Sequence, residues 1–197
     1  MCSIIGFQGV YETDLITRLC YNSRIRGLHS FGFSFYQNGK LQVKKYLNYD
    51  KFLTDLNKHK PNKFIAHFRY STSGDYKKIE NNQPLIYEDQ SIIFNGVISQ
   101  KSKDEMQEEF QLKLTAENDG FVLVQKYDDL EFIKNRNISF AMIALSDNKL
   151  IALRNNNRPL HCYQDKKKTV FASTKDILIR SGLLQSTELT PLQKMII

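Results

Sequence analysis

Apolar and polar residues follow one another along the chain in patterns typical of both strands and helices. The runs "SIIGFQ" and "FIAHFRYS" are apolar on nearly every position, which is typical of strands covered on both faces. Leu15, Ile16 and Leu19 recur at helical spacing between a Thr or Asp cap and a terminal Gly27. The pattern predicts strands at 3–8, 31–36, 41–47, 64–71, 91–98, 139–146, 149–155 and 169–174, and helices at 13–27, 49–59, 102–114 and 175–182.

Turn signals connect these elements. Asn38-Gly39 and Asp147-Asn148 lie between paired strand signals, because these residues tolerate the positive backbone angles of a tight hairpin. Many strands, several of them apolar on both faces, favour two packed sheets with helices on the outside. We therefore expect a layered α+β fold in one domain spanning 1–197, with no linker, internal repeat or further synthase domain in the chain.

Composition and charge limit the partners and the cellular location that we expect. The net charge of +7 comes from lysines spread along 197 residues without interleaved aromatics, so we do not expect a nucleic-acid partner. No run approaches the roughly 20 apolar residues of a membrane helix, and we expect a soluble protein. Three scattered cysteines without a CxxC pair predict neither a disulfide framework nor a zinc site, and they favour a reducing, cytoplasmic location.

The first residues, "MCSIIGFQG", place a cysteine directly behind the initiator methionine, without the features of a signal peptide. A strand that starts at the terminus can deliver Cys2 to a cleft between two sheets. Once Met1 is removed, such a cysteine carries a thiol nucleophile and its own base, an α-amino group with a pKa of about 7.7 to 8.0. The alternative is that Cys2 is a small buried apolar residue at the start of a strand.

Seven short motifs occur together in one order along the chain. They are "MCSIIGF", "RIRGLHSFG", "AHFRYSTSG", "NNQPL", "IIFNGVI", "ENDGFVLV" and "FASTKDILIRSG". Together they resemble the glutaminase domain of class II glutamine amidotransferases, the N-terminal nucleophile hydrolases found at the front of asparagine synthetase, amidophosphoribosyltransferase and the hexosamine-phosphate synthase. The resemblance runs from Cys2 to about Gly182 and implies a four-layer αββα sandwich of two mainly antiparallel sheets.

The resemblance implies how glutamine would be held. Arg69 would grip the α-carboxylate as a bidentate fork, with the Thr72 hydroxyl assisting. Asp119 would hold the α-ammonium group. Without the surrounding motif, Arg69 would be an ordinary arginine at a strand end. Asp119 can also be the N-cap of the helix "GFVLVQKY", a role compatible with binding.

The resemblance also assigns the groups around the reacting carbonyl. The Asn95 side chain and the Gly96 N–H would form the oxyanion hole, although Asn-Gly is also a common turn signal. Arg26 would support this region near the nucleophile. Two positions depart from the family pattern, since His29 replaces an acidic residue and Phe94 replaces a histidine. We interpret His67 as structural, because Cys2 brings its own base.

The resemblance therefore implies hydrolysis of the L-glutamine side-chain amide through a Cys2 thioester, with no metal or organic cofactor. Three functions remain open. The chain can be a glutaminase that feeds ammonia to a separate synthase, one that amidates a nucleotide or sugar. It can be a free-standing hydrolase of other γ-glutamyl amides, or a catalytically silent binding module. If a synthase receives the ammonia, the loop 73–84 is the expected gate, because it joins the Arg69 strand to the Asn95 strand.

Overall fold

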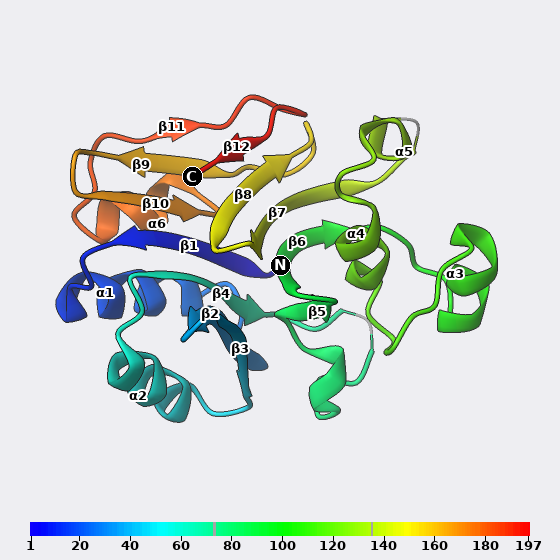
Figure 1. Cartoon of the computed structure of the whole chain (residues 1–197), viewed down its shortest axis with the longest axis horizontal. Helices are drawn as coiled ribbons and strands as arrows, with labels where there is room; N and C mark the ends of the chain where they lie inside the picture. The colour runs from blue at the N-terminus through cyan, green and yellow to red at the C-terminus, as the bar shows by residue number, and fades with distance from the viewer. Residues whose placement is uncertain (73, 135) are drawn as a thin grey trace.

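A computed structural model of the chain describes residues 1–72, 74–134 and 136–197. Within these residues the strands form two sheets that pack face to face, with helices on the outer faces (Figure 1). Every described strand pair is antiparallel. No helix in the described ranges is long and apolar enough to cross a membrane.

The larger sheet has seven strands, which are β1 (Ser3–Gly9), β2 (Ser30–Gln37), β3 (Lys40–Tyr46), β4 (Lys63–Arg69), β9 (His161–Gln164), β10 (Lys168–Ala172) and β11 (Thr187–Glu188). Their order is β11-β9-β10-β1-β4-β2-β3. Strand β1 pairs with β10 on one side and with β4 on the other. The N-terminal strand is thus at the centre of the sheet, where both edges are hydrogen-bonded.

The smaller sheet has five strands, which are β5 (Leu85–Tyr87), β6 (Gln90–Val97), β7 (Ser139–Ser146), β8 (Lys149–Arg154) and β12 (Met195–Ile196). Their order is β12-β8-β7-β6-β5. The last residues of the chain therefore serve both sheets, because β11 extends the larger sheet and β12 extends the smaller one.

The helices complete the outer layers. They are α1 (Thr13–Arg24), α2 (Tyr49–His59), α3 (Lys103–Phe110), α4 (Gly120–Lys126), α5 (Leu130–Lys134), α6 (Lys175–Arg180) and the 3₁₀ turn η1 (Ile79–Asn81). Helices α1, α2 and α6 contact the larger sheet, whereas α4 contacts β5 and β6 of the smaller one.

Three apolar clusters correspond to the three contacts between four layers. Phe7 and Leu19 belong to the cluster between the larger sheet and its helices. Ile4 and Ile143 belong to the cluster between the two sheets. Leu123 belongs to the cluster between the smaller sheet and its helices. This arrangement confirms the expected α+β fold, a four-layer αββα sandwich.

Helix α1 differs from its prediction at both ends. Glu12 occupies the N-cap position without a side-chain cap bond, and the helix ends at Arg24, so the predicted Thr or Asp cap and the terminal glycine are wrong. A Cβ atom on Gly27 would lie 2.3 Å from the carbonyl oxygen of Phe68. Gly27 therefore allows close packing against β4 and does not end the helix.

Helix α3 begins as the pattern predicts. The Ser102 and Glu105 side chains form a capping box with each other's backbone. The helix ends at Phe110, four residues before the predicted end at Leu114, because Gln111 adopts a left-handed conformation with φ 53°. A residue in this conformation ends an α-helix.

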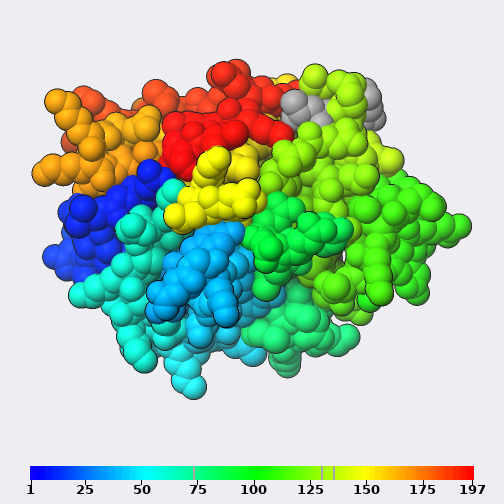
Figure 2. Space-filling model, viewed as in Figure 1, coloured from blue at the N-terminus to red at the C-terminus, as the bar shows by residue number. Residues whose placement is uncertain are grey.

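The predicted hairpin turns lie at one end of the sandwich. Asn38, Gly39, Asp147 and Asn148 all have positive φ, as a tight hairpin turn requires. Figure 2 shows the segments around these turns, light blue and yellow, close together on one face. Because β2 starts beside Arg69 and ends at the first turn, Arg69 lies at the opposite end of the sheet.

Candidate active site

Three of the predicted site residues lie on the faces that the two sheets turn toward each other. Side chains alternate between the two faces of a strand. Ile4, Ile65 and Ile93 belong to the cluster between the sheets, so residues an even number of positions away in the same strands face the same space. Three predicted site residues do so: Cys2, Arg69 and Asn95.

These residues also lie at the same end of their strands. Cys2 immediately precedes β1, Arg69 ends β4, and Asn95 is near the end of β6. Strands β1 and β4 pack against β6 across the sandwich, and the N-terminus lies beside β6 in Figure 1. The fold thus brings together residues from three distant parts of the sequence.

Cys2 is partly exposed, and its thiol lies 3.7 Å from the carbonyl oxygen of Tyr70. Its own carbonyl oxygen accepts a hydrogen bond from Nε of Arg26 at 3.4 Å. Burial raises the pKa of the Cys2 thiol, while the charge of Arg69 lowers this pKa and that of Asp119 raises it. The thiol therefore lies in the electrostatic field of a cation and an anion from different parts of the chain.

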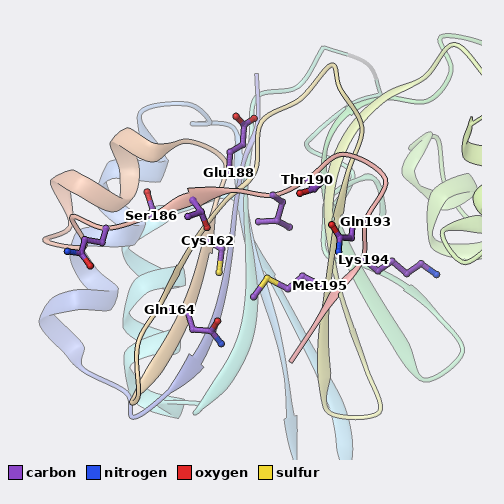
Figure 3. A pocket seen from close by; sticks show the side chains of 11 residues that line it. Cys162, Gln164, Ser186, Glu188, Thr190, Gln193, Lys194 and Met195 are labelled. Carbon is purple, nitrogen blue, oxygen red and sulfur yellow. The ribbon is translucent and has the colours of Figure 1, made fainter.

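The other two cysteines lack this setting. Cys20 is on the fully buried face of α1, and burial strongly raises the pKa of its thiol. Cys162 lines a cavity of about 580 Å³ between β9 and the C-terminal segment, where its side chain faces Met195 (Figure 3). Burial alone raises the pKa of the Cys162 thiol to about 11. Cys2 is thus the cysteine that combines access with neighbouring charges.

Arg69 is buried and held by the segment that follows it in the sequence. One of its terminal nitrogens, Nη1, donates to the Asn81 carbonyl oxygen at 2.8 Å and to Asn82 Oδ1 at 2.5 Å. Nη2 donates to the Gly74 carbonyl oxygen at 3.3 Å. These bonds fix the plane of the guanidinium, as recognition of a carboxylate requires.

Asp119 is held by backbone N–H groups that follow β6. Its Oδ2 atom accepts hydrogen bonds from the backbone N–H groups of Ile98 at 2.6 Å and Ser99 at 3.2 Å. Burial raises the pKa of Asp119, and these two N–H groups lower it. Asp119 occupies the N-cap position of α4, as the alternative interpretation expects, but its side chain makes no cap bond there.

Asn95 and Gly96 lie near the end of β6, where they still pair with β7. The Asn95 side chain is buried, and its Nδ2 donor has no hydrogen-bond partner among the described residues. Burying a donor without a partner costs about 1 to 3 kcal/mol, which makes such an atom a candidate ligand-binding group. A Cβ atom on Gly96 would lie 1.8 Å from the Ser139 carbonyl oxygen. Glycine is therefore required at this position by the approach of β7.

Comparison with known proteins finds likeness in structure. No protein-family profile and no curated protein matches the chain. Among solved structures, the glutamine phosphoribosylpyrophosphate amidotransferase from B. subtilis complexed with ADP and GMP matches 95% of the chain with a TM-score of 0.73 and 20% identity. An allosteric regulatory enzyme of purine biosynthesis matches the same share with a TM-score of 0.74 and 21% identity.

The chain has the fold of the class II glutamine amidotransferases. It spans 44% of the length of each of these two structures. A glutamine aminotransferase class-II domain protein from Silicibacter pomeroyi is similar over 99% of this chain and 94% of its own, with a TM-score of 0.60 and 12% identity. At these identities the likeness concerns the fold, and the roles of single residues rest on the geometry above.

His29, one departure from the amidotransferase pattern, holds the segment after β4. Its ring stacks between Tyr70 and Tyr76, with ring centroids 4.9 and 4.8 Å away. Its Nδ1 atom accepts a hydrogen bond from the Ser71 N–H at 2.9 Å. An imidazole thus stands where the family pattern has an acid, and it anchors the loop that follows Arg69.

Phe94, the other departure, points away from the nucleophile. It belongs to the cluster between the smaller sheet and its helices. A Cβ atom on Gly120 would lie 2.1 Å from the Phe94 ring, so the ring packs directly on the start of α4. The replacement of histidine by Phe94 therefore affects how the start of α4 packs, next to Asp119.

The remaining predicted positions differ in their exposure. Thr72 is exposed in the loop after β4. His67 is fully buried between the sheets, and burial followed by the charge of Arg69 lowers its pKa to about 3. A neutral, enclosed imidazole fits the structural role expected for it. In the candidate gate 73–84, Ser73 lies outside the described residues.

The sequence motif "NNQP" has a positioning role that residue patterns alone did not predict. Asn81, Asn82 and Gln83 are buried. The first two accept the hydrogen bonds of Arg69, and Gln83 Oε1 accepts one from the Phe94 N–H at 2.6 Å. The segment thus connects the candidate carboxylate-binding arginine to the strand that carries Asn95. The sequence signal that pointed to this segment was the resemblance of "NNQPL" to a family motif.

Proposed function

We propose that the chain hydrolyses γ-glutamyl amides, with L-glutamine as the reference substrate, through a thioester on Cys2. The observation that carries this proposal is a thiol under the influence of both a buried guanidinium, Arg69, and a largely buried carboxylate, Asp119. Glutamine presents an α-carboxylate and an α-ammonium group, which these two charges complement. The amidotransferase fold supports the proposal.

In this mechanism Met1 is removed, and the α-amino group of Cys2 takes the proton of its thiol. The thiolate attacks the δ-carbonyl carbon, and the oxyanion accepts hydrogen bonds from Asn95 Nδ2 and the Gly96 N–H. The C–N bond then breaks, and the leaving nitrogen takes the proton from the α-ammonium group of Cys2. Water hydrolyses the γ-glutamyl thioester to glutamate and restores the thiol.

The other residues hold the substrate and the nucleophile. Arg69 binds the α-carboxylate with help from the Thr72 hydroxyl, and Asp119 binds the α-ammonium group. Arg26 supports the nucleophile, since its guanidinium hydrogen-bonds the Cys2 carbonyl oxygen. The orphaned Asn95 donor is consistent with a group kept ready for charge that develops during the reaction.

Release of glutamate from L-glutamine by matched cysteine variants tests the proposal. Cys2→Ser should abolish release and change the melting temperature little, because the thiol does not fill the core. Cys162→Ser, in the cavity between β9 and the C-terminal segment, should retain the activity. Glutamate release by Cys2→Ser at the wild-type rate would contradict the mechanism, and no release by either protein would support the silent binding module.

Two kinds of enzyme are candidates, and they differ in what happens to the released ammonia. We propose first that a separate synthase receives it, in keeping with two similar structures of which the chain spans 44%. In this case residues 1–197 form a single glutaminase domain that acts with another polypeptide. The second candidate is a free-standing hydrolase, in keeping with the similar S. pomeroyi protein, 94% of which the match covers.

Turnover of the purified chain separates these candidates. A glutaminase subunit should release ammonia from L-glutamine slowly alone and faster when a synthase and its acceptor are added. A free-standing hydrolase should reach full turnover alone on a suitable γ-glutamyl amide. Vigorous ammonia release without a partner would contradict the subunit proposal.

A further inference from the structure

Two guanidinium groups lie beside the side chain of Met1, which is 62% exposed. Nη1 of Arg158 lies 3.6 Å from the Met1 sulfur, and Nη2 of Arg26 lies 4.0 Å from it. Nε of Arg158 is buried without a hydrogen-bond partner among the described residues. The volume that Met1 occupies is therefore lined by two cations, one of which has an unused donor.

The loop that carries Arg158 is firmly anchored. The buried Arg154 donates to the Arg158 carbonyl oxygen at 3.1 Å and to the Leu189 carbonyl oxygen at 2.7 Å. Its guanidinium also pairs with Glu188 at 3.0 Å. Among the described residues, the Glu188 carboxylate forms its ion pair with Arg154 and not with Arg158.

The mechanism determines what enters this volume after Met1 is removed. The leaving nitrogen takes a proton from the Cys2 α-amino group, so the two nitrogens must approach within about 2.6 to 3.2 Å. Met1 is bonded to the same α-nitrogen before its removal. A substituent on the leaving nitrogen therefore extends toward the space that Met1 vacates, where Arg26 and Arg158 can reach it.

We infer that Arg26 and Arg158 form a subsite for a carboxylate on the leaving amine, which makes γ-glutamyl amino acids the favoured substrate class. The inference rests on the proposed function, because it requires attack by a terminal Cys2. Of the two candidates above it goes with the free-standing hydrolase, because an amino acid leaves in place of ammonia. Two guanidinium groups can offer a carboxylate several charge-assisted hydrogen bonds. Ammonia, the leaving group of glutamine, has no carboxylate and gains nothing from this subsite.

The chemistry of the step is that of the glutaminase reaction. The Cys2 sulfur forms a bond to the δ-carbonyl carbon as the bond from that carbon to the amino-acid nitrogen breaks. The nitrogen takes its proton from the α-ammonium group of Cys2, and a free amino acid leaves. Water then cleaves the thioester to glutamate.

Two dipeptide substrates of nearly equal shape test the inference. γ-Glutamylglycine carries a carboxylate on the leaving amine, whereas γ-glutamylglycinamide carries a neutral amide in its place. We expect kcat/KM of the mature wild-type chain to be about tenfold or more higher for the acid, as one charge-assisted hydrogen bond would give. Arg158→Gln should bring this ratio close to one, and Arg158→Lys should retain part of it.

Arg180→Gln is the matched control, because Arg180 is exposed on α6 and pairs with Asp176. It should keep the wild-type ratio. A wild-type ratio near one, or an unchanged ratio in a folded Arg158→Gln, would overturn the inference while glutamine hydrolysis still supports the proposed function. Should Arg158→Gln fail to fold, the wild-type ratio decides alone. If neither the dipeptides nor glutamine release glutamate in a reaction that depends on Cys2, both the inference and the proposed function are overturned.

Discussion

At the scale of single residues, the site depends on charges held in surroundings with little water. Arg69 is only 5% exposed, and carbonyl and amide oxygens accept hydrogen bonds from its guanidinium. Asp119 is held by backbone N–H groups, which stabilise its carboxylate. The two charges are fixed separately, so each can serve a different end of a zwitterionic substrate.

Arg69→Lys should raise KM for L-glutamine by about tenfold or more, because lysine keeps the charge but loses the planar pair of N–H donors. Steady-state glutamate release over a range of glutamine concentrations measures this effect. Arg180→Lys, on the exposed face of α6, is the control and should leave KM unchanged. If KM of Arg69→Lys equals that of wild type, Arg69 does not hold the α-carboxylate.

His67 predicts a specific dependence of stability on pH. Its pKa is lowered to about 3 in the folded chain, chiefly by burial. Between the usual histidine pKa of about 6.5 and this value, the unfolded chain binds a proton that the folded chain does not. The free energy of unfolding therefore falls as pH decreases through this window, and His67 contributes about 2 kcal/mol of the loss between pH 7 and pH 5.

Urea unfolding of wild type and His67→Gln at pH 7 and pH 5 checks this sign and size. The variant should lose about 2 kcal/mol less than wild type between the two pH values. If both proteins lose the same free energy of unfolding, the pKa of His67 is not lowered in the folded chain, and this prediction is wrong.

At the scale of elements, the segment 81–83 is unusual because it is short, polar and buried. Asn82 is fully buried, and its side chain accepts from Arg69 and donates to the Tyr76 carbonyl oxygen at 2.7 Å. Gln83 joins the same segment to β6. The segment is therefore a structural bridge between the elements that carry the candidate substrate-binding arginine and the candidate oxyanion donor.

Asn82→Ala should raise KM for L-glutamine several-fold and lower the free energy of unfolding by about 1 to 3 kcal/mol, because it removes an acceptor from a buried guanidinium. Kinetics and urea unfolding measure the two effects together. Asn57→Ala is the control, since the Asn57 side chain bonds the Tyr11 hydroxyl under α2. It should lower stability without changing KM, and the same result for Asn82→Ala would restrict Asn82 to a structural role.

The sequence predicts the elements whose signals are local. The hairpin turns follow from Asn-Gly and Asp-Asn, and the start of α3 follows from the Ser102 and Glu105 capping box. Strands β5, β9, β11 and β12 have two to four residues, too few to show a period, and their neighbours determine their pairing. A buried "NNQ" segment has the composition of a surface loop, so its role depends on contacts that only the fold reveals.

At the scale of the whole molecule, the candidate site depends on the packing of both sheets. Cys2 and Arg69 come from the larger sheet, and Asn95 comes from the smaller one. Strand alternation predicts which way each side chain faces, but not which strands lie across from each other. The family resemblance identified these residues, while their proximity follows from the cluster that joins the two sheets. Their catalytic roles stay predictions.

Intact-mass spectrometry after exposure to a diazoketone analogue of L-glutamine tests the central claim most directly. The analogue places an electrophilic carbon at the amide position, and a thiolate displaces its dinitrogen to form a stable C–S bond. The account predicts a chain that starts at Cys2 and carries one adduct on that residue, which excess L-glutamine prevents. An adduct on Cys20 or Cys162, no adduct at all, or Met1 retained in a chain that hydrolyses glutamine would contradict it.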